Sequence, residues 1–268
     1  MEDIKLSVII PCYNLGLYLE EAVESVISFV VVGAIELILV NDGSTDKNTL
    51  RVIKTIKTKY PDIRVIHQDN QGLAKARNNG IAIAKGTYII PLDADNKLRS
   101  VFISESIAIL DTYTEVQVVY GNAEYFGTKS GLMGVLPFDV EELVLNNYID
   151  ACACFRKTAW EAVGGYDEQM PIMGFEDWDM WLRMMVKGFQ FRYVDCVFFD
   201  YRAREGSMLS NAWEHRTMLL DYMFSKPSLQ HLSYYRRCVL ENRQLKEEPS
   251  FKYLIGVLVK KLKRRLGF

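Results

Sequence analysis

The chain has 268 residues, of which 49% are hydrophobic and 25% are charged, so it can bury a substantial core. This composition excludes a disordered or collagen-like chain, and the five cysteines have neither the spacing of a disulfide framework nor that of a zinc site. A net charge of −2 gives no overall attraction to nucleic acid, so we expect no nucleic-acid partner. With no basic leader and no apolar run of about 20 residues, the sequence predicts a cytoplasmic protein without a transmembrane anchor.

The first hundred residues alternate short apolar runs with amphipathic segments. Four strands separated by three helices predict an α/β fold in which a mostly parallel sheet has helices on both faces. The strands are expected at 6–11, 36–40, 64–67 and 87–92, and the helices around 19–26, before residue 59 and at 72–84.

The pattern becomes irregular after about residue 100. We find no internal repeat or low-complexity linker, so both halves are expected to share one sheet. The expected elements are a helix at 100–112, strands at 116–120, 123–126 and 151–156, an irregular stretch at 127–150, and helices at 157–163 and 176–187.

Polar clusters follow each of the four strands in the first half. Ligands bind at the carboxyl ends of strands in an open parallel sheet, so four such clusters favour one shared cleft. Each cluster taken alone is equally consistent with turn formers and helix caps. The clusters are Tyr13-Asn14, Asn41-Asp42, Asp69-Asn70 and Asp93-Ala94-Asp95.

The last of these clusters places two carboxylates two residues apart at the end of an apolar strand. Such carboxylates suit a hard divalent cation that bridges the protein to a diphosphate and neutralises the leaving group. The alternative is a pair of solvated turn aspartates, which is the commoner origin of a bare D-x-D pattern. The position directly after a buried strand favours the ligand role.

Six segments together resemble the inverting nucleotide-sugar glycosyltransferases of family 2, which have the GT-A fold. They occur in the family's order between about residues 6 and 210, and jointly they are far more specific than any one motif. The segments are SVIIPCYN at 7–14, VNDGSTD at 40–46, NQGLAKARNNG at 70–80, LDAD at 92–95, GGYDE at 164–168 and EDWD at 176–179.

The resemblance implies a donor site in the first half, with a nucleotide sugar, most simply a UDP-sugar, as ligand. Lys75 and Arg77 would lie near the diphosphate; the alternative is a solvated basic helix face, which the sequence favours more for Lys75 than for Arg77. Asp93 and Ala94 would face the ribose, and Asp95 would hold Mn²⁺ or Mg²⁺. The base and ribose would be contacted by Pro11, Tyr13, Asn14, Asp42 and Asp69.

The resemblance further implies that Asp177, with Glu176 beside it, is the general base that deprotonates the acceptor hydroxyl. The alternative is that these acids only complement the dipole of a helix N-terminus. Inversion in one step needs no enzyme nucleophile, in keeping with the lack of a serine–histidine or cysteine–histidine signature. Trp178 is expected in the core, with stacking on a sugar ring as the alternative.

One position departs from the family pattern. Many relatives have a histidine that ligates the metal in a late Tyr-Arg-x-His segment, and here Arg204 stands at that position. A guanidinium cannot ligate a metal but can pair with a diphosphate, so metal dependence is expected to be weaker or the coordination different.

We therefore expect a nucleotide-sugar-binding half at 1–98, an acceptor-binding and catalytic half at 99–215, and a helical extension at 216–268. The expected activity is inverting transfer of a sugar to a hydroxyl of a glycan or polyprenyl-linked saccharide; the alternatives are a non-catalytic sugar-nucleotide-binding subunit and a sugar nucleotidyltransferase. Residues 251–268 form a basic amphipathic pattern that predicts peripheral membrane contact or, alternatively, docking on the protein body or on a second copy in an oligomer.

Overall fold

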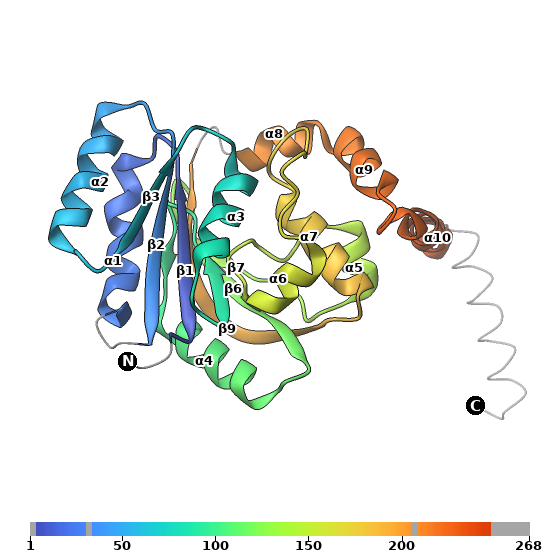
Figure 1. Cartoon of the computed structure of the whole chain (residues 1–268). Helices are drawn as coiled ribbons and strands as arrows, with labels where there is room; N and C mark the ends of the chain where they lie inside the picture. The colour runs from blue at the N-terminus through green and yellow to red at the C-terminus, as the bar shows by residue number, and fades with distance from the viewer. Residues whose placement is uncertain (1–3, 31–33, 205–207, 248–268) are drawn as a thin grey trace, which may run out of the picture. The chain divides into compact units, whose positions relative to one another are not determined.

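The computed structural model describes residues 4–30, 34–204 and 208–247. One nine-stranded sheet contains strands from both halves of the sequence, in the order β3-β2-β1-β4-β8-β6-β9-β5, with β7 paired to β6 (Figure 1). The strands are β1 (Leu6–Cys12), β2 (Ile35–Asp42), β3 (Arg64–Gln68), β4 (Tyr88–Pro91), β5 (Lys97–Leu98), β6 (Val116–Gly127), β7 (Gly131–Met133), β8 (Cys154–Arg156) and β9 (Gln190–Ala203). The helices are α1 (Gly16–Val30), α2 (Lys47–Lys59), α3 (Leu73–Ile83), α4 (Ser100–Thr112), α5 (Val140–Leu145), α6 (Lys157–Val163), α7 (Glu176–Val186), α8 (Met208–Glu214), α9 (Arg216–Ser225) and α10 (Gln230–Glu247).

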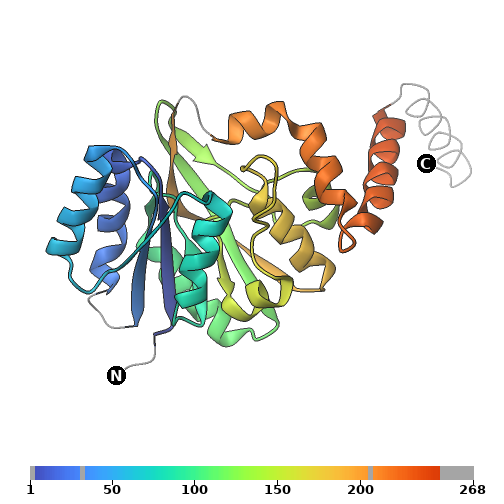
Figure 2. The same ribbon diagram turned by 45° about the horizontal axis from the view of Figure 1, so that its top comes forward.

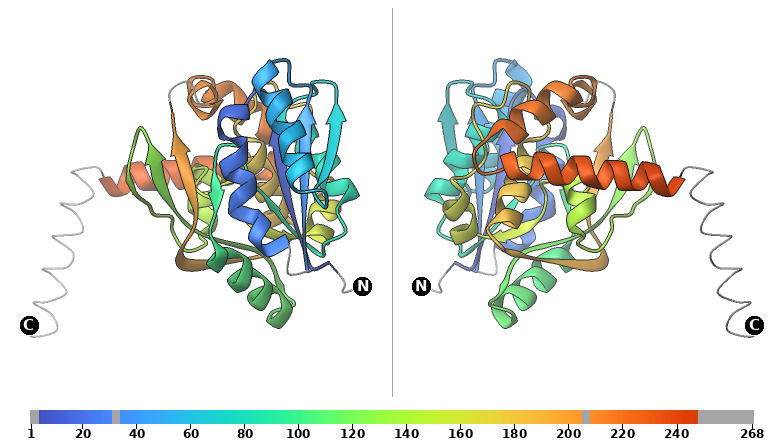
Figure 3. Two further views of the ribbon diagram at one scale, coloured as in Figure 1. Left: turned by 90° about the vertical axis from the view of Figure 1, so that its left-hand side faces the viewer. Right: turned by 90° about the vertical axis from the view of Figure 1, so that its right-hand side faces the viewer.

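The first half is the parallel part of the sheet. β1 is buried along its whole length and pairs in parallel with β2 and β4, and β2 pairs in parallel with β3. Alternate side chains of these strands pack against α1, α2 and α4 in one hydrophobic core, and the left panel of Figure 3 shows α1 and α2 together over the sheet. α3 packs on the opposite face, where Gly80 lies against Ile9. The predicted α/β fold is confirmed, with helices on both faces.

The second half differs from the expected pattern in four elements. The two strands expected at 116–120 and 123–126 are one continuous strand, β6, whose pairing with β9 is irregular around Gly121 and Asn122. The stretch expected to be irregular contains β7 and α5. β9 has no counterpart among the predicted elements because its residues are mostly half-buried and form no continuous apolar run.

The carboxyl ends of β1, β2 and β4 lie at the end of the sheet that Figure 2 tips toward the viewer. The chain divides into two compact units, residues 1–223 and 224–268, of which the second contains α10. The basic segment 251–268 lies outside the described residues. Among the helices that are described, none is long and apolar enough to cross a membrane.

Candidate active site

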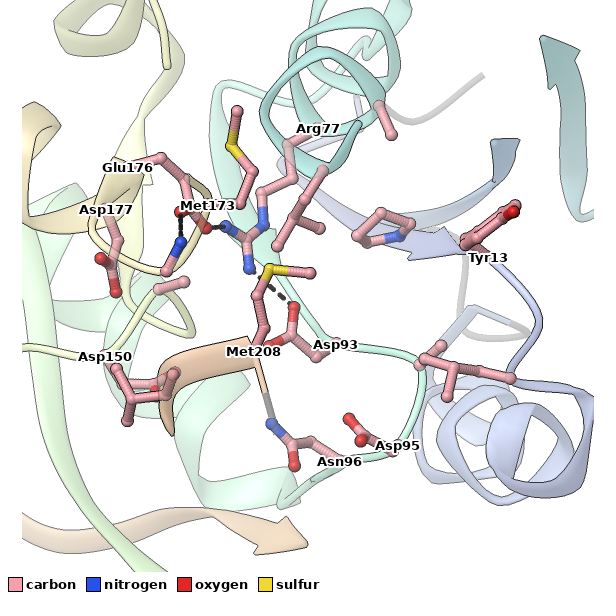
Figure 4. A pocket seen from close by; sticks show the side chains of 18 of the residues that line it. Tyr13, Arg77, Asp93, Asp95, Asn96, Asp150, Met173, Glu176, Asp177 and Met208 are labelled. Atoms are coloured by element: carbon pink, nitrogen blue, oxygen red, sulfur yellow. Dashed lines mark hydrogen bonds and ion pairs between the residues drawn. The ribbon is translucent and has the colours of Figure 1, made fainter. Parts of the chain in front are cut away.

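A cavity of about 450 Å³ lies at the carboxyl ends of β1, β2 and β4. Its wall combines these strand ends with the start of α3, residues 147–151, the start of α7, and residues from 201–204 and 208–213 (Figure 4). Segments more than 160 positions apart in the chain therefore meet in one hollow, as the four strand-end clusters predict. The sequence-predicted site residues in the wall are Pro11, Tyr13, Asp42, Arg77, Asp93, Ala94, Asp95, Glu176, Asp177 and Arg204.

Three sequence-predicted residues are not part of this wall. Asn14 adopts a left-handed backbone conformation (φ 55°), and its side-chain oxygen accepts hydrogen bonds from the N–H groups of Thr45 and Asp46. Lys75 pairs with Glu168, with 2.9 Å between Nζ and Oε2, and Asp69 is exposed. Asn14 and Lys75 thus have local structural partners, and donor contacts by any of the three stay predictions.

Asp42 shapes the loop that borders the cavity. Its Oδ1 accepts from Gln68 Nε2 and from the N–H of Gln71, both at 2.8 Å, and its Oδ2 accepts from the N–H of Gly72 at 3.0 Å. The next residue, Gly43, has φ +70°, and a Cβ there would lie 2.5 Å from the backbone nitrogen of Asn70, so only glycine fits. This carboxylate therefore fixes the loop between β3 and α3 while it faces the cavity.

Arg77 joins the two acidic motifs. Its Nη1 lies 2.6 Å from Glu176 Oε1 and its Nη2 lies 2.7 Å from Asp93 Oδ1. The guanidinium is 2% exposed, and the two carboxylates raise its pKa well above the usual range despite burial. Because both pairs are buried or half-buried and charge-assisted, they hold the end of β4 and the start of α7 in a fixed relation.

Asp177 has one carboxylate oxygen that is held by the protein. Oδ1 accepts from Asn147 Nδ2 at 3.0 Å and from the N–H of Trp178 at 2.7 Å, and the side chain borders the cavity. Burial raises the pKa of Asp177 well above the ordinary range, and the neighbouring charges of Glu176 and Asp150 add to the effect. A carboxylate with a raised pKa is a stronger base, which suits proton abstraction from a hydroxyl.

Asp179, the third acid of the same helical turn, has a structural role. It is fully buried and pairs with Arg183, at 2.8 Å between Nε and Oδ2. Trp178 is also fully buried, and its Nε1 donates to the carbonyl of Leu143 at 2.6 Å. The core placement of Trp178 is confirmed, and the alternative of stacking on a sugar ring is wrong because no face of the indole is open.

Asp95 meets Arg204 directly, with 2.7 Å between Oδ2 and Nε. Burial and the charge of Asp93 raise the pKa of Asp95, and the hydrogen bond from Arg204 opposes that shift. Within the described part of the chain, no group of three or more histidine, cysteine, aspartate or glutamate side chains could hold a metal ion. The residues fit a divalent cation only in the mode in which Mg²⁺ and Mn²⁺ take one or two carboxylates and complete their shell with substrate phosphates and water.

The cavity wall also includes residues that the sequence did not single out, notably Asn147 and Asp150. α7 anchors this stretch: Trp178 bonds to Leu143, Asn147 to Asp177, and Trp181 Nε1 donates to the carbonyl of Ile149 at 3.1 Å. No local pattern marks Asp150, because its place in the wall depends on a helix some 30 residues later in the chain.

The strand order and the cavity at the strand ends are those of the GT-A fold. Residues 7–160 match the model of glycosyl transferase family 2, and residues 143–207 match the N-terminal domain of galactosyltransferase. The chain belongs to glycosyl transferase family 2.

One curated relative is the uncharacterized glycosyltransferase YibD of Escherichia coli K12, 37% identical over 127 residues, which cover 47% of this chain and 36% of the relative. The structure of S. aureus TarS 1–349 in complex with UDP-GlcNAc superposes with a TM-score of 0.62 at 20% identity, over 78% of this chain and 61% of the TarS 1–349 chain. The structure of the mannosyltransferase PcManGT of Pyrobaculum calidifontis, in complex with GDP-Man and Mn²⁺, superposes with a TM-score of 0.63 at 16% identity, over 96% of this chain and 79% of the PcManGT chain. The chain spans from a fifth to about half of the length of the first curated relatives it matches. At these identities the two structures establish the fold alone.

Proposed function

We propose that this chain transfers a hexose or N-acetylhexosamine from a nucleoside-diphosphate donor, UDP in the simplest case, to a hydroxyl of a glycan or polyprenyl-linked saccharide, with inversion. The observation that supports it most directly is that Asp177 borders the same cavity as Asp93 and Asp95. A base and a diphosphate-binding motif in one cavity are what a single-displacement transfer requires.

In the proposed reaction, Asp177 accepts the proton of the acceptor hydroxyl as its oxygen attacks the anomeric carbon. The bond between that carbon and the diphosphate oxygen breaks on the opposite face, which inverts the configuration. Asn147 and the N–H of Trp178 hold Oδ1 of the base, so the second oxygen is directed to the acceptor. Arg77 keeps Glu176 and Asp93 in place on either side of the sugar.

The diphosphate is proposed to lie near Asp95 and Arg204. Arg204 can turn from Asp95 to the phosphate oxygens, because a guanidinium pairs with either oxyanion. A divalent cation, when bound, would be held by Asp95 and would neutralise charge on the leaving diphosphate. The nucleoside is proposed to contact Pro11, Tyr13 and Asp42.

The test is Asp177→Asn, assayed by nucleotide release over a set of donor sugars and by binding of UDP. Loss of the base is expected to lower kcat about 100- to 10,000-fold, and the affinity for UDP should stay within about twofold of the wild-type value because Asp177 lies away from the nucleoside end. The nucleotidyltransferase alternative predicts no nucleotide release from any donor sugar, and the binding-subunit alternative predicts no turnover in the wild type. Either result would contradict the proposal.

A further inference from the structure

Asp150 is a carboxylate in the cavity wall for which the proposed reaction has no task. It is partly buried, and one of its oxygens, Oδ1, accepts the N–H of Cys152 at 2.8 Å. Burial and the charge of Asp93 raise its pKa to about 6, so the group is largely ionised at neutral pH in spite of its surroundings. A carboxylate that stays ionised in a partly buried cavity wall, despite the free-energy cost of desolvation, is a candidate for contact with a ligand.

The position of Asp150 along the cavity indicates which part of a donor it meets. In Figure 4, Tyr13 lies at one end of the cavity, Asp93 and Asp95 lie between, and Asp150 and Asp177 lie at the other end. With the nucleoside at Tyr13 and the diphosphate at Asp95, the sugar extends toward Asp150 and Asp177. This step rests on the proposed function.

The side chain is also held firmly enough to select a ligand. The carbonyl of Ile149, the residue before Asp150, accepts a hydrogen bond from Nε1 of the fully buried Trp181. The backbone N–H of Cys152, two residues after Asp150, donates to Oδ1 of Asp150. Groups fixed by packing and hydrogen bonds on both sides discriminate better than mobile ones.

The charges at this end of the cavity are one-sided. Among the described wall residues, the sugar end has three carboxyl groups, those of Asp150, Glu176 and Asp177, and a single guanidinium, that of Arg77, which also pairs with Asp93 in the middle of the cavity. Both Nη atoms of Arg77 are already bonded to carboxylates. A sugar that brings a further carboxylate would meet like charges in a partly desolvated site, which is strongly unfavourable.

We propose that Asp150 determines the specificity for the transferred sugar: its cavity-facing oxygen accepts a hydrogen bond from a donor-sugar hydroxyl, and its charge excludes uronate sugars. The ligand class is thus an uncharged hexose or N-acetylhexosamine on a nucleoside diphosphate.

The test compares wild type with Asp150→Asn, which is isosteric and retains an oxygen for the Cys152 N–H. The probes are UDP alone and the pair UDP-glucose and UDP-glucuronate, whose sugars differ only at the exocyclic carbon. The corresponding galactose pair is used in the same way. Asp62→Asn, an exposed site outside the cavity, is the charge-matched control. Binding is measured by calorimetry, and donor hydrolysis without acceptor is measured by nucleotide release.

We expect Asp150→Asn to weaken the neutral UDP-sugar about 10- to 100-fold, the effect of losing a hydrogen bond to a charged group, and to leave UDP itself within about twofold. Donor hydrolysis should slow, and the preference for the neutral donor over the uronate should shrink by about tenfold or more. Retained UDP affinity shows that a variant is folded. Asp150→Glu, which keeps the negative charge, serves as a second variant and should exclude the uronate as the wild type does.

Unchanged binding of the neutral donor by Asp150→Asn, or wild-type use of the uronate as efficient as that of the neutral sugar, would overturn the inference. The proposed function would still stand in that case if the wild type transfers sugar from a donor to an acceptor. A defect seen only with acceptor present would overturn it too, because the contact would then be to the acceptor. If the wild type binds no nucleotide and releases none from any donor, the proposed function and this inference both fail.

Discussion

Replacing Arg77 by methionine should reduce stability more than any exposed substitution. The Arg77 side chain is 2% exposed. The methionine keeps most of its aliphatic stem but removes the guanidinium, which pairs with Glu176 at 2.6 Å and Asp93 at 2.7 Å. The loss leaves Glu176, itself 3% exposed, as a buried carboxylate whose charge has lost its partner. Breaking a buried pair in this way costs about 3–5 kcal/mol.

That loss is a large fraction of the about 5–15 kcal/mol that stabilises a typical domain. It corresponds to a decrease in Tm of about 6–20 °C, at about 2–4 °C per kcal/mol for a chain of this size. Urea unfolding followed by tryptophan fluorescence measures it. Arg51→Met is the control, because Arg51 is exposed and its guanidinium donates to the exposed side chain of Asn48.

The two partners should also be coupled. Glu176→Gln removes the charge that Arg77 compensates, so the double variant Arg77→Met/Glu176→Gln should lose less than the sum of the two single variants, by about 1–3 kcal/mol. The reasoning is refuted if Arg77→Met costs less than about 1 kcal/mol beyond the Arg51 control, or if the two changes are simply additive.

Three further outcomes follow from the described contacts. The pKa of Asp150 in the folded chain, about 6, lies above its value in an unfolded chain, so the wild type loses stability as pH rises from about 4 to 6 and this carboxyl group gives up its proton. The free energy of unfolding of Asp150→Asn, measured in urea at pH 4 and pH 7, should therefore rise relative to wild type between these pH values, by at most about 3 kcal/mol. An unchanged difference between the two proteins would contradict burial as the cause of the raised pKa. Arg204→Ala frees Oδ2 of Asp95 and should strengthen Mn²⁺ binding in the absence of nucleotide about three- to tenfold, measured by electron paramagnetic resonance; weaker binding would count against competition between the two cations. Gly80→Ala places a Cβ 2.5 Å from Ile9 Cγ2 and should cost about 1–3 kcal/mol of unfolding free energy, and full stability would mean that α3 can move off the sheet.

The parallel half of the fold could be predicted from the sequence because its signals are local. β1 and β2 are buried almost throughout and therefore appear as continuous apolar runs, and α1 has apolar residues at helical spacing. The polar residues after these strands, such as Asp42, meet in a cavity because parallel strands end at one edge.

The second half could not be predicted as well because its structure depends on distant partners. β9 is mostly half-buried, without a continuous apolar run, and is held by β6, about 75 positions earlier in the chain. Lys75 pairs with Glu168, 93 positions away, and a single sequence contains no signal for that pairing.

α7 connects these observations, because it supplies the proposed base and also positions the wall opposite it. Glu176 and Asp177 stand in its first turn, while the buried indoles of Trp178 and Trp181 fix the carbonyls of Leu143 and Ile149. The base and the wall at Asp150 are therefore set by one rigid helix, so their separation changes little when loops of the cavity adapt to a ligand. The sequence motif locates the base, but only the packing of two buried tryptophans brings a second carboxylate to the sugar end of the cavity.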